Sequence, residues 1–277
     1  MPVEFTIILL IVVSFFIGLY GSLVGFGGGI FMVPILITFF GFPLNLAVGT
    51  CMISLVGSSL ISTYYNRKDS FVDFKMGTIL EIPTIIGVVI GSLLLTYVDS
   101  RKLEYVFAGM IIILGLSFFI KLGQKDKNKE GFFARLNKMN PKMIIKNHKN
   151  YVAYRVSIVM LIFFGSFSGI LAGLFGVGGG FMKTPIMIKV FKIPAKIATA
   201  TALFMIVITS ITGSVSHYLQ GHIDFLKSWP VIIGFALGAF ASKKLNTHLQ
   251  DKTLEKMIGV GLLVAAIVMV FNFIYNR

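Results

Sequence analysis

Apolar residues fill most of the chain in ten long stretches, which short polar or glycine-rich breaks separate. Most of these stretches reach roughly 20 residues, the length at which an α-helix crosses about 30 Å of hydrocarbon. We therefore predict an all-α polytopic membrane protein. The stretches cover residues 5–25, 29–41, 46–66, 76–97, 103–121, 152–176, 180–191, 197–217, 228–243 and 254–274.

Two of these stretches, 29–41 and 180–191, are about half the usual length and are too short to cross the hydrocarbon as a helix at about 1.5 Å per residue. A glycine triplet precedes each, a proline lies inside each, and another proline follows each: Gly27–Gly29, Pro34 and Pro43, then Gly178–Gly180, Pro185 and Pro194. A short, glycine-interrupted segment at corresponding places in two halves is typical of a transporter binding site. We predict a broken helix in each half.

The chain contains an internal repeat without gaps. One constant shift places Gly18 on Gly169 and the first glycine triplet on the second. The same shift aligns further pairs: Pro34 with Pro185, Thr50 with Thr201, Ser59 with Ser210, and Asp73-Phe74 with Asp224-Phe225. Apolar composition alone cannot align glycines, prolines and Asp-Phe pairs in one register, so the halves are homologous.

Five stretches per half, an odd number, predict repeats of inverted orientation. Loop charges agree if the basic centre of the chain is cytoplasmic, because the 189–196 loop carries three lysines and its counterpart at 41–46 carries no charge. We expect a first repeat at 1–121, a basic cytoplasmic loop at 122–151 and a second repeat at 152–277. Both termini would then be extracytoplasmic, in a cell (inner or plasma) membrane. If the short stretches instead re-enter, each half crosses four times and the repeats become parallel.

The charge balance changes this picture little. The net charge is +14, from 25 Lys and Arg against 11 Asp and Glu, and nine of the basic residues lie between Lys121 and Asn150. Such an excess would suggest nucleic acid in a soluble protein, but between membrane spans it is typical of a cytoplasmic loop. We therefore predict no nucleic-acid partner.

Enzymatic, metal and cofactor chemistry finds little support in the residues. Cys51 is the one cysteine, and the four histidines show no metal-ligand spacing. No Gly-Lys-[Ser/Thr] follows either glycine triplet, which argues against a phosphate-binding loop. We expect no metal, no cofactor and no enzymatic activity.

The stretches Gly21-Ser-Leu-Val-Gly-Phe-Gly-Gly-Gly-Ile-Phe-Met-Val-Pro34 and Ala172-Gly-Leu-Phe-Gly-Val-Gly-Gly-Gly-Phe-Met-Lys-Thr-Pro185 resemble the TauE/SafE family of membrane permeases. The resemblance extends over essentially the whole chain, with both repeats and the basic middle loop in order. It implies a permease of about ten segments whose cargo is sulfite, sulfoacetate or a related sulfur-containing anion.

The glycine triplets are the candidate anion site. At a helix break the first backbone amides lack partners, and together with the helix dipole they attract an oxyanion, which glycine lets approach the backbone. We predict that the cradle consists of Gly27, Gly28, Gly29, Gly178, Gly179 and Gly180. The alternative is that these glycines allow close helix packing.

Two charged residues in apolar stretches are further candidates. Lys183 lies in the short segment and could neutralise the anion, or it could extend its ammonium to the membrane interface. Glu81 could carry a proton and couple transport to a proton gradient, or it could pair with Lys75 or Arg67.

Hydroxyl groups could complete the hydrogen bonds of a bound anion. Thr50 and Thr201 are preferred because they recur, and Ser59 and Ser210 come next. Such hydroxyls also bond to their own helix or join helices. His217 and His222 flank a loop that we interpret as solvated, with a proton relay as the alternative.

The sequence thus predicts a lipid-embedded exporter of small anions, such as sulfite or organosulfonates, that works by alternating access. Import of an anion or of another solute, and a receptor or structural role, are the alternatives. The chain leaves its coupling ion (a proton or another ion) open, and it does not specify whether it forms a homo-oligomer.

Overall fold

The computed structural model describes residues 3–98, seven residues between 102 and 113, and residues 142–147, 152–246 and 251–275. Apart from a single two-stranded hairpin, the regular elements among these residues are helices, so the all-α prediction is confirmed. The continuous helices are α1 (Val3–Val24), α2 (Gly29–Phe40), α3 (Leu44–Lys68), α4 (Phe74–Tyr97), α7 (Ile158–Phe175), α8 (Gly180–Lys189), α9 (Ala195–Leu219), α10 (Phe225–Asn246) and α11 (Asp251–Tyr275). The seven described residues between 102 and 113 are helical too, and the remainder of the predicted stretch 103–121 lies outside the described residues.

Six of the described helices are long and apolar enough to cross a membrane. Their outer faces present large apolar side chains, among them Phe16, which is 63% exposed, and Ile86, which is 61% exposed. A soluble protein rarely exposes apolar surface so widely, whereas lipid accepts it. The chain is a multi-pass membrane protein.

The two short helices have the predicted lengths. Helix α2 has 12 residues and α8 has 10, which correspond to roughly 18 Å and 15 Å at 1.5 Å per residue. Each begins at a left-handed glycine, Gly28 with φ of 106° and Gly179 with φ of 71°. Because side chains with a Cβ rarely adopt these angles, glycine is needed where the chain turns into each short helix.

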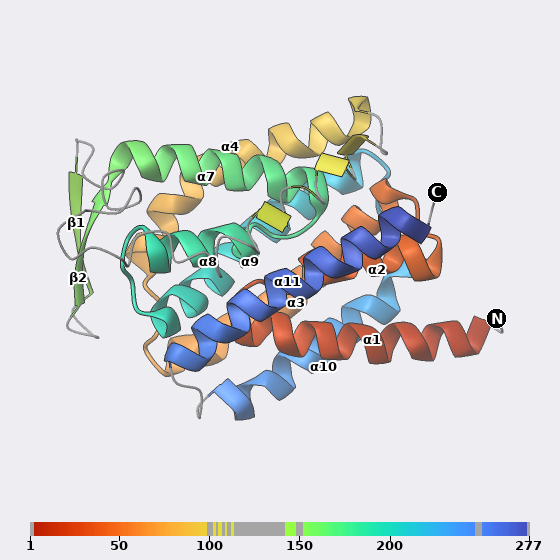
Figure 1. Ribbon diagram of the computed structural model, residues 1–277, viewed down its shortest axis with the longest axis horizontal. Coiled ribbons are helices and arrows are strands. Elements are labelled where there is room, and N and C mark those ends of the chain that lie inside the picture. Colours follow the sequence, from red (N-terminus) through yellow and green to blue (C-terminus); the bar gives the residue numbers. More distant parts are fainter. Residues whose placement is uncertain are drawn as a thin grey trace.

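The halves are interleaved and do not lie as two separate bundles. Figure 1 shows α4 and α7 side by side along one edge and α1 and α10 along the opposite edge, with α3 and α9 packed between them. The repeat relates α1 to α7 and α10 to α4, so each edge pairs one helix from each half. In Figure 1, α1 begins and α11 ends at one end of the molecule, and α1 and α7 run in opposite directions. The inverted orientation of the repeats in a membrane stays a prediction.

Glycines bring the edge helices into backbone contact. A Cβ on Gly169 of α7 would lie 2.2 Å from the carbonyl oxygen of Thr84 on α4. At the equivalent position of the other edge, a Cβ on Gly18 of α1 would lie 2.8 Å from the Cα of Phe235 on α10. Small residues allow such close approach where lipid gives helices no hydrophobic reason to associate. The two edges therefore use the same packing device.

One prediction is wrong at its start. The stretch 152–176 was expected to be a single apolar segment, but residues Val152–Ser157 form strand β2, which pairs antiparallel with β1 (Lys142–Asn147). Tyr154 and Val156 are buried while Ala153 is exposed, so the side chains alternate as a strand requires. Helix α7 begins only at Ile158, after the N-cap Ser157.

The hairpin is attached to the helices through a buried hydrogen bond. The Tyr154 hydroxyl donates to Oδ2 of Asp73, whose Oδ1 caps α4 by accepting from the Met76 amide at 3.0 Å. Asp73 thus fixes both the start of α4 and the position of β2. Apart from β1, the predicted basic loop 122–151 lies outside the described residues.

Candidate functional site

The two glycine turns meet backbone to backbone at the centre of the protein. A Cβ on Gly29 would lie 2.6 Å from the carbonyl oxygen of Gly176, and a Cβ on Gly180 would lie 2.5 Å from that of Gly25. These two contacts are equivalent under the sequence repeat. The structure therefore brings both predicted triplets together, with every one of their residues buried.

Several amides at these turns are unpaired. In the first turn, the amides of Gly25, Phe26 and Gly27 all donate to the carbonyl of Gly21, at 2.9–3.0 Å. Among the hydrogen bonds of the described residues, none uses the amides that open the two short helices. These amides belong to Gly28, Gly29 and Ile30 before and within α2, and to Gly178, Gly179, Gly180 and Phe181 before and within α8. They are the free donors that a helix N-terminus offers to a negative ligand.

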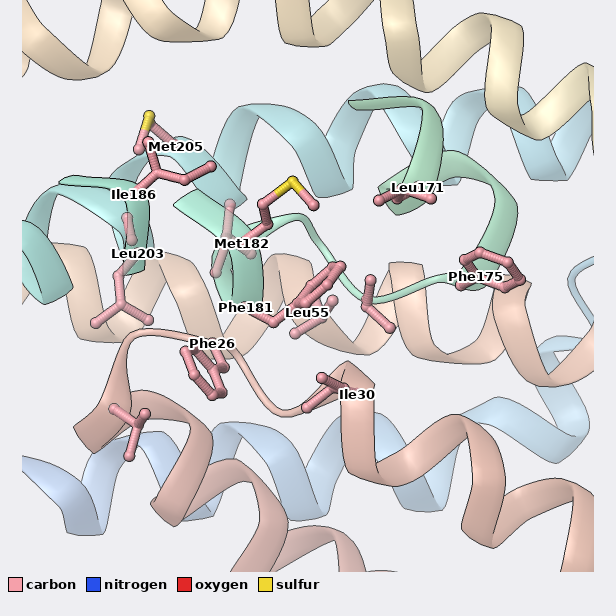
Figure 2. Close-up of a cluster of buried hydrophobic side chains, with 14 of the residues drawn as sticks. Phe26, Ile30, Leu55, Leu171, Phe175, Phe181, Met182, Ile186, Leu203 and Met205 are labelled. Atoms are coloured by element: carbon pink, nitrogen blue, oxygen red, sulfur yellow. The ribbon is translucent and has the colours of Figure 1, made fainter. Parts of the chain in front are cut away.

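Apolar side chains cover the turns in this conformation. Figure 2 shows Phe26 and Ile30 flanking one turn, Phe175 and Phe181 flanking the other, and Leu55 between them. Positions Gly27 and Gly178 both face Leu55 and Ile206, which are themselves repeat equivalents. The glycines therefore do allow close packing, as the alternative interpretation held. The unpaired amides are a further property of the same turns, which packing does not explain.

Lys183 on α8 extends back over its own glycine turn, with its Cε 3.3 Å from the position that a Cβ on Gly179 would occupy. Its side chain is 1% exposed, and its ammonium donates to Oε2 of Glu81 on α4 at 2.5 Å and to Oγ1 of Thr209 on α9 at 3.0 Å. The Thr209 hydroxyl donates in turn to Oε1 of Glu81. We call Glu81, Lys183 and Thr209 the charged triad.

The charged triad corrects two of the sequence interpretations. Lys183 does not extend its ammonium to the protein surface, because the ammonium is bound in the interior. Glu81 pairs with Lys183 and not with Lys75 or Arg67. An ammonium has three N–H donors, and the bonds among the described residues use two of those on Lys183. One buried donor therefore remains beside the α8 turn.

The four predicted hydroxyls have other partners. Thr50 bonds to the Ser228 hydroxyl of α10 at 2.9 Å, and Thr201 accepts from the Asp73 amide at the start of α4 at 3.0 Å. These residues thus join the middle helix of one half to the first turn of a helix in the other. Ser59 and Ser210 donate to carbonyls of their own helices, at 2.5 Å and 3.2 Å. None of these hydrogen bonds joins a hydroxyl to a residue of the glycine turns.

Comparison with known proteins identifies the family. A sequence model of the family described as "Sulfite exporter TauE/SafE" matches residues 10–269. The chain belongs to the TauE/SafE family. It is 29% identical to the probable membrane transporter protein YunE of Bacillus subtilis, with 97% of this chain and 99% of the relative covered. No solved structure matches the chain.

Two further proteins are also similar over nearly their whole length. A probable membrane transporter protein from Methanocaldococcus jannaschii is 30% identical and covers 92% of this chain, which spans 90% of the relative. The probable membrane transporter protein YfcA of Escherichia coli K12 is 23% identical, with 90% and 86% covered. This chain is accordingly a membrane transporter and not an enzyme.

This TauE/SafE protein has its charged triad in one half only. The repeat equivalents of Glu81, Lys183 and Thr209 are Ile232, Met32 and Ser58. The glycine turns are thus nearly symmetric, whereas the charge beside them is not. A single anion beside α8 would meet an ionic environment that the α2 side lacks.

A buried histidine pair, His217 in the last turn of α9 and His222 in the loop that follows, corrects a further interpretation. His217 and His222 are 0% and 7% exposed, so neither belongs to a solvated loop. The Nε2 of His217 lies 2.9 Å from the carbonyl oxygen of Gly173 and must donate, because a carbonyl only accepts. Its Nδ1, 3.3 Å from the Nδ1 of His222, is then an acceptor when the ring is neutral. The contacts thus specify the tautomers of a neutral pair.

Sequence reasoning did not single out Thr209 from the other hydroxyls of its helix, and it missed that Glu81 and Lys183 are partners. Each charge was assessed alone, yet opposite charges buried in apolar segments must pair if both are ionised. The signal was present, because both positions are charged in one half and apolar in the other. Thr209 carried a weaker signal, since Ser58 at the equivalent position retains a hydroxyl.

Proposed function

We propose that this transporter exports small anions, such as sulfite or organosulfonates, by alternating access between inverted repeats. The anion would be held at the glycine turns by the free amides at the starts of α2 and α8. The observation that carries the proposal is that these amides are buried and make no hydrogen bond among the described residues, and that the two sets lie at equivalent positions of the repeat. Export is the direction in the description of the family, and import of the same anions is the alternative.

Burial of the turns supports a moving carrier and argues against an open pore. The apolar residues of Figure 2 cover both turns, so an anion reaches the amides only when the helices around them shift. The interleaved edges offer a way to move, because α1 with α10 and α4 with α7 could each shift as a pair against α3 and α9. In the cell membrane, the basic centre of the chain would face the cytoplasm.

Flux in proteoliposomes tests the function. The purified protein should exchange labelled sulfite or sulfoacetate across the membrane and should leave an uncharged solute of similar size unmoved. Sulfate tests whether the site requires the sulfonate or sulfite group. Transport of the uncharged solute, or exchange of none of the three anions, would refute anion transport. Vesicles in which the protein is inserted in opposite orientations, each preparation loaded with anion and assayed by itself, report the direction of transport.

A matched pair of glycine variants tests the cradle. Gly179→Ala places a methyl group within the α8 turn at φ of 71°, where it meets Lys183. Gly41→Ala causes comparable left-handed strain at φ of 65°, with no atom within 4 Å. We expect Gly179→Ala to lower anion flux by about tenfold or more, equivalent to at least about 1.4 kcal/mol. Gly41→Ala should retain flux, and equal flux in the two variants would remove the cradle from the proposal.

A further inference from the structure

The buried ion pair offers the transporter a proton-binding group next to its proposed anion site. We propose that Glu81 is the resident counter-ion of Lys183, and that a substrate anion replaces it at the ammonium when Glu81 accepts a proton from solution. One proton would then travel with each unit of negative charge bound, and the outward concentration gradient of the anion would drive export. This inference rests on the proposed function and adds the coupling ion and the exchange step to it.

Three contacts in the structure support this exchange. The Glu81 carboxylate binds the Lys183 ammonium at 2.5 Å, in the way that an anionic ligand would. Thr209 donates to Glu81 and accepts from Lys183, so it can stabilise the ammonium after the carboxylate has left. The third Lys183 donor and the free α8 amides lie on the same turn. An anion at that turn would therefore find its positive partner without any long movement of Lys183.

Charge balance requires the proton. While Glu81 is ionised, the triad has no net charge and the buried ammonium is already neutralised. An additional anion would leave an uncompensated negative charge in the interior, which is costly. Protonation of Glu81 removes one negative charge as the anion brings one. The interior therefore stays neutral through the cycle for each unit of negative charge that enters.

Lys183 is the ionisable side chain that faces Glu81. Helix α7, which packs along α4, has no ionisable side chain in its described range. Within the described parts of α4, α8 and α9, the remaining ionisable side chains make no ion pair or hydrogen bond with Glu81. These residues are Lys75, Tyr97, Lys189, Lys196, His217 and Tyr218. Glu81 and Lys183 thus form a local pair for coupling.

The test compares wild-type protein with Glu81→Gln, which imitates the protonated acid, and with Glu4→Gln, which removes a carboxylate at the exposed start of α1. Labelled sulfite and sulfoacetate are first exchanged at equal pH. The exterior is then made acidic. For one proton carried per anion, each unit of pH difference drives about a tenfold ratio of internal to external anion. Wild type and Glu4→Gln should accumulate the anion. Glu81→Gln should still exchange it, with an accumulation ratio of about one.

Each outcome separates this inference from the proposed function. Accumulation by Glu81→Gln equal to that of wild type would overturn the inference and leave anion transport standing. Loss of exchange in folded Glu81→Gln would overturn it too, because the amide should be competent. A pH-sensitive dye inside wild-type vesicles gives an answer without a variant, since anion entry without proton entry also contradicts the coupling. If wild type exchanges neither anion, the proposed function itself has failed.

Discussion

Removal of one member of the Glu81–Lys183 pair should destabilise the protein far more than removal of both. The chain supplies its own apolar replacement, because the repeat equivalents of these residues are Ile232 and Met32. We therefore consider Lys183→Met, Glu81→Ile and the double variant. In the double variant, the charged site becomes apolar like its counterpart in the other half.

The magnitude follows from the burial of the pair. Both side chains are 1% exposed and bind at 2.5 Å, and breaking such a pair from one side typically costs about 3–5 kcal/mol. Replacing both partners with apolar residues is often neutral or stabilising. The double variant should therefore be at least about 3 kcal/mol more stable than Lys183→Met. A lower pH should reduce the cost in Lys183→Met, because the orphaned carboxyl can then be neutral.

Unfolding in mixed micelles can measure these differences. Trp229 is the only tryptophan of the chain and lies on α10, away from the substituted helices, so its fluorescence reports unfolding in every variant. The double variant should fold and fail to transport. Single variants that unfold at the same detergent composition as the double variant would refute the view that the pair compensates two buried charges.

Three further predictions concern other contacts. Gly180→Ala should destabilise the protein by about 1–3 kcal/mol through overpacking, whereas Gly57→Ala, with no atom within 4 Å, should not; thermal unfolding in detergent compares them. Tyr154→Phe should cost about 1–3 kcal/mol by leaving buried Asp73 short of a donor, which limited proteolysis at the hairpin would detect. Burial lowers the pKa of His222 in the α9–α10 loop, so the unfolded state binds the proton more readily and stability should fall as pH drops below about 6.5. A His222→Asn variant should lose that part of the pH dependence, and an unchanged profile would assign it elsewhere.

The local features of the fold could be predicted because their causes are local. Left-handed backbone angles at Gly25, Gly27 and Gly28 form the turn between α1 and α2, which the glycine motif reveals directly, and the left-handed C-cap Gly41 ends α2. The start of α4 was likewise recognisable from Asp73, whose carboxylate caps the helix. The strand at 152–157 was not predicted, because the long apolar run that begins at Ile158 was extended back over its alternating pattern.

The charged triad needed tertiary structure. Glu81 and Lys183 are 102 residues apart and lie in different halves, and no spacing rule relates them. The hydroxyl of Thr201 was equally ambiguous, because a membrane helix gives no sign in sequence of whether a threonine faces a ligand or another helix. The family resemblance specified the class of protein but not these partners.

The cross-pairing of α1 with α10 and of α4 with α7 has a consequence for biogenesis. When the ribosome has delivered the first half to the bilayer, the glycine-lined faces of α1 and α4 still lack their mates. They remain against lipid until the second half is inserted, and assembly therefore waits for the end of translation. Two separately synthesised halves would have to find each other before either could complete its packing.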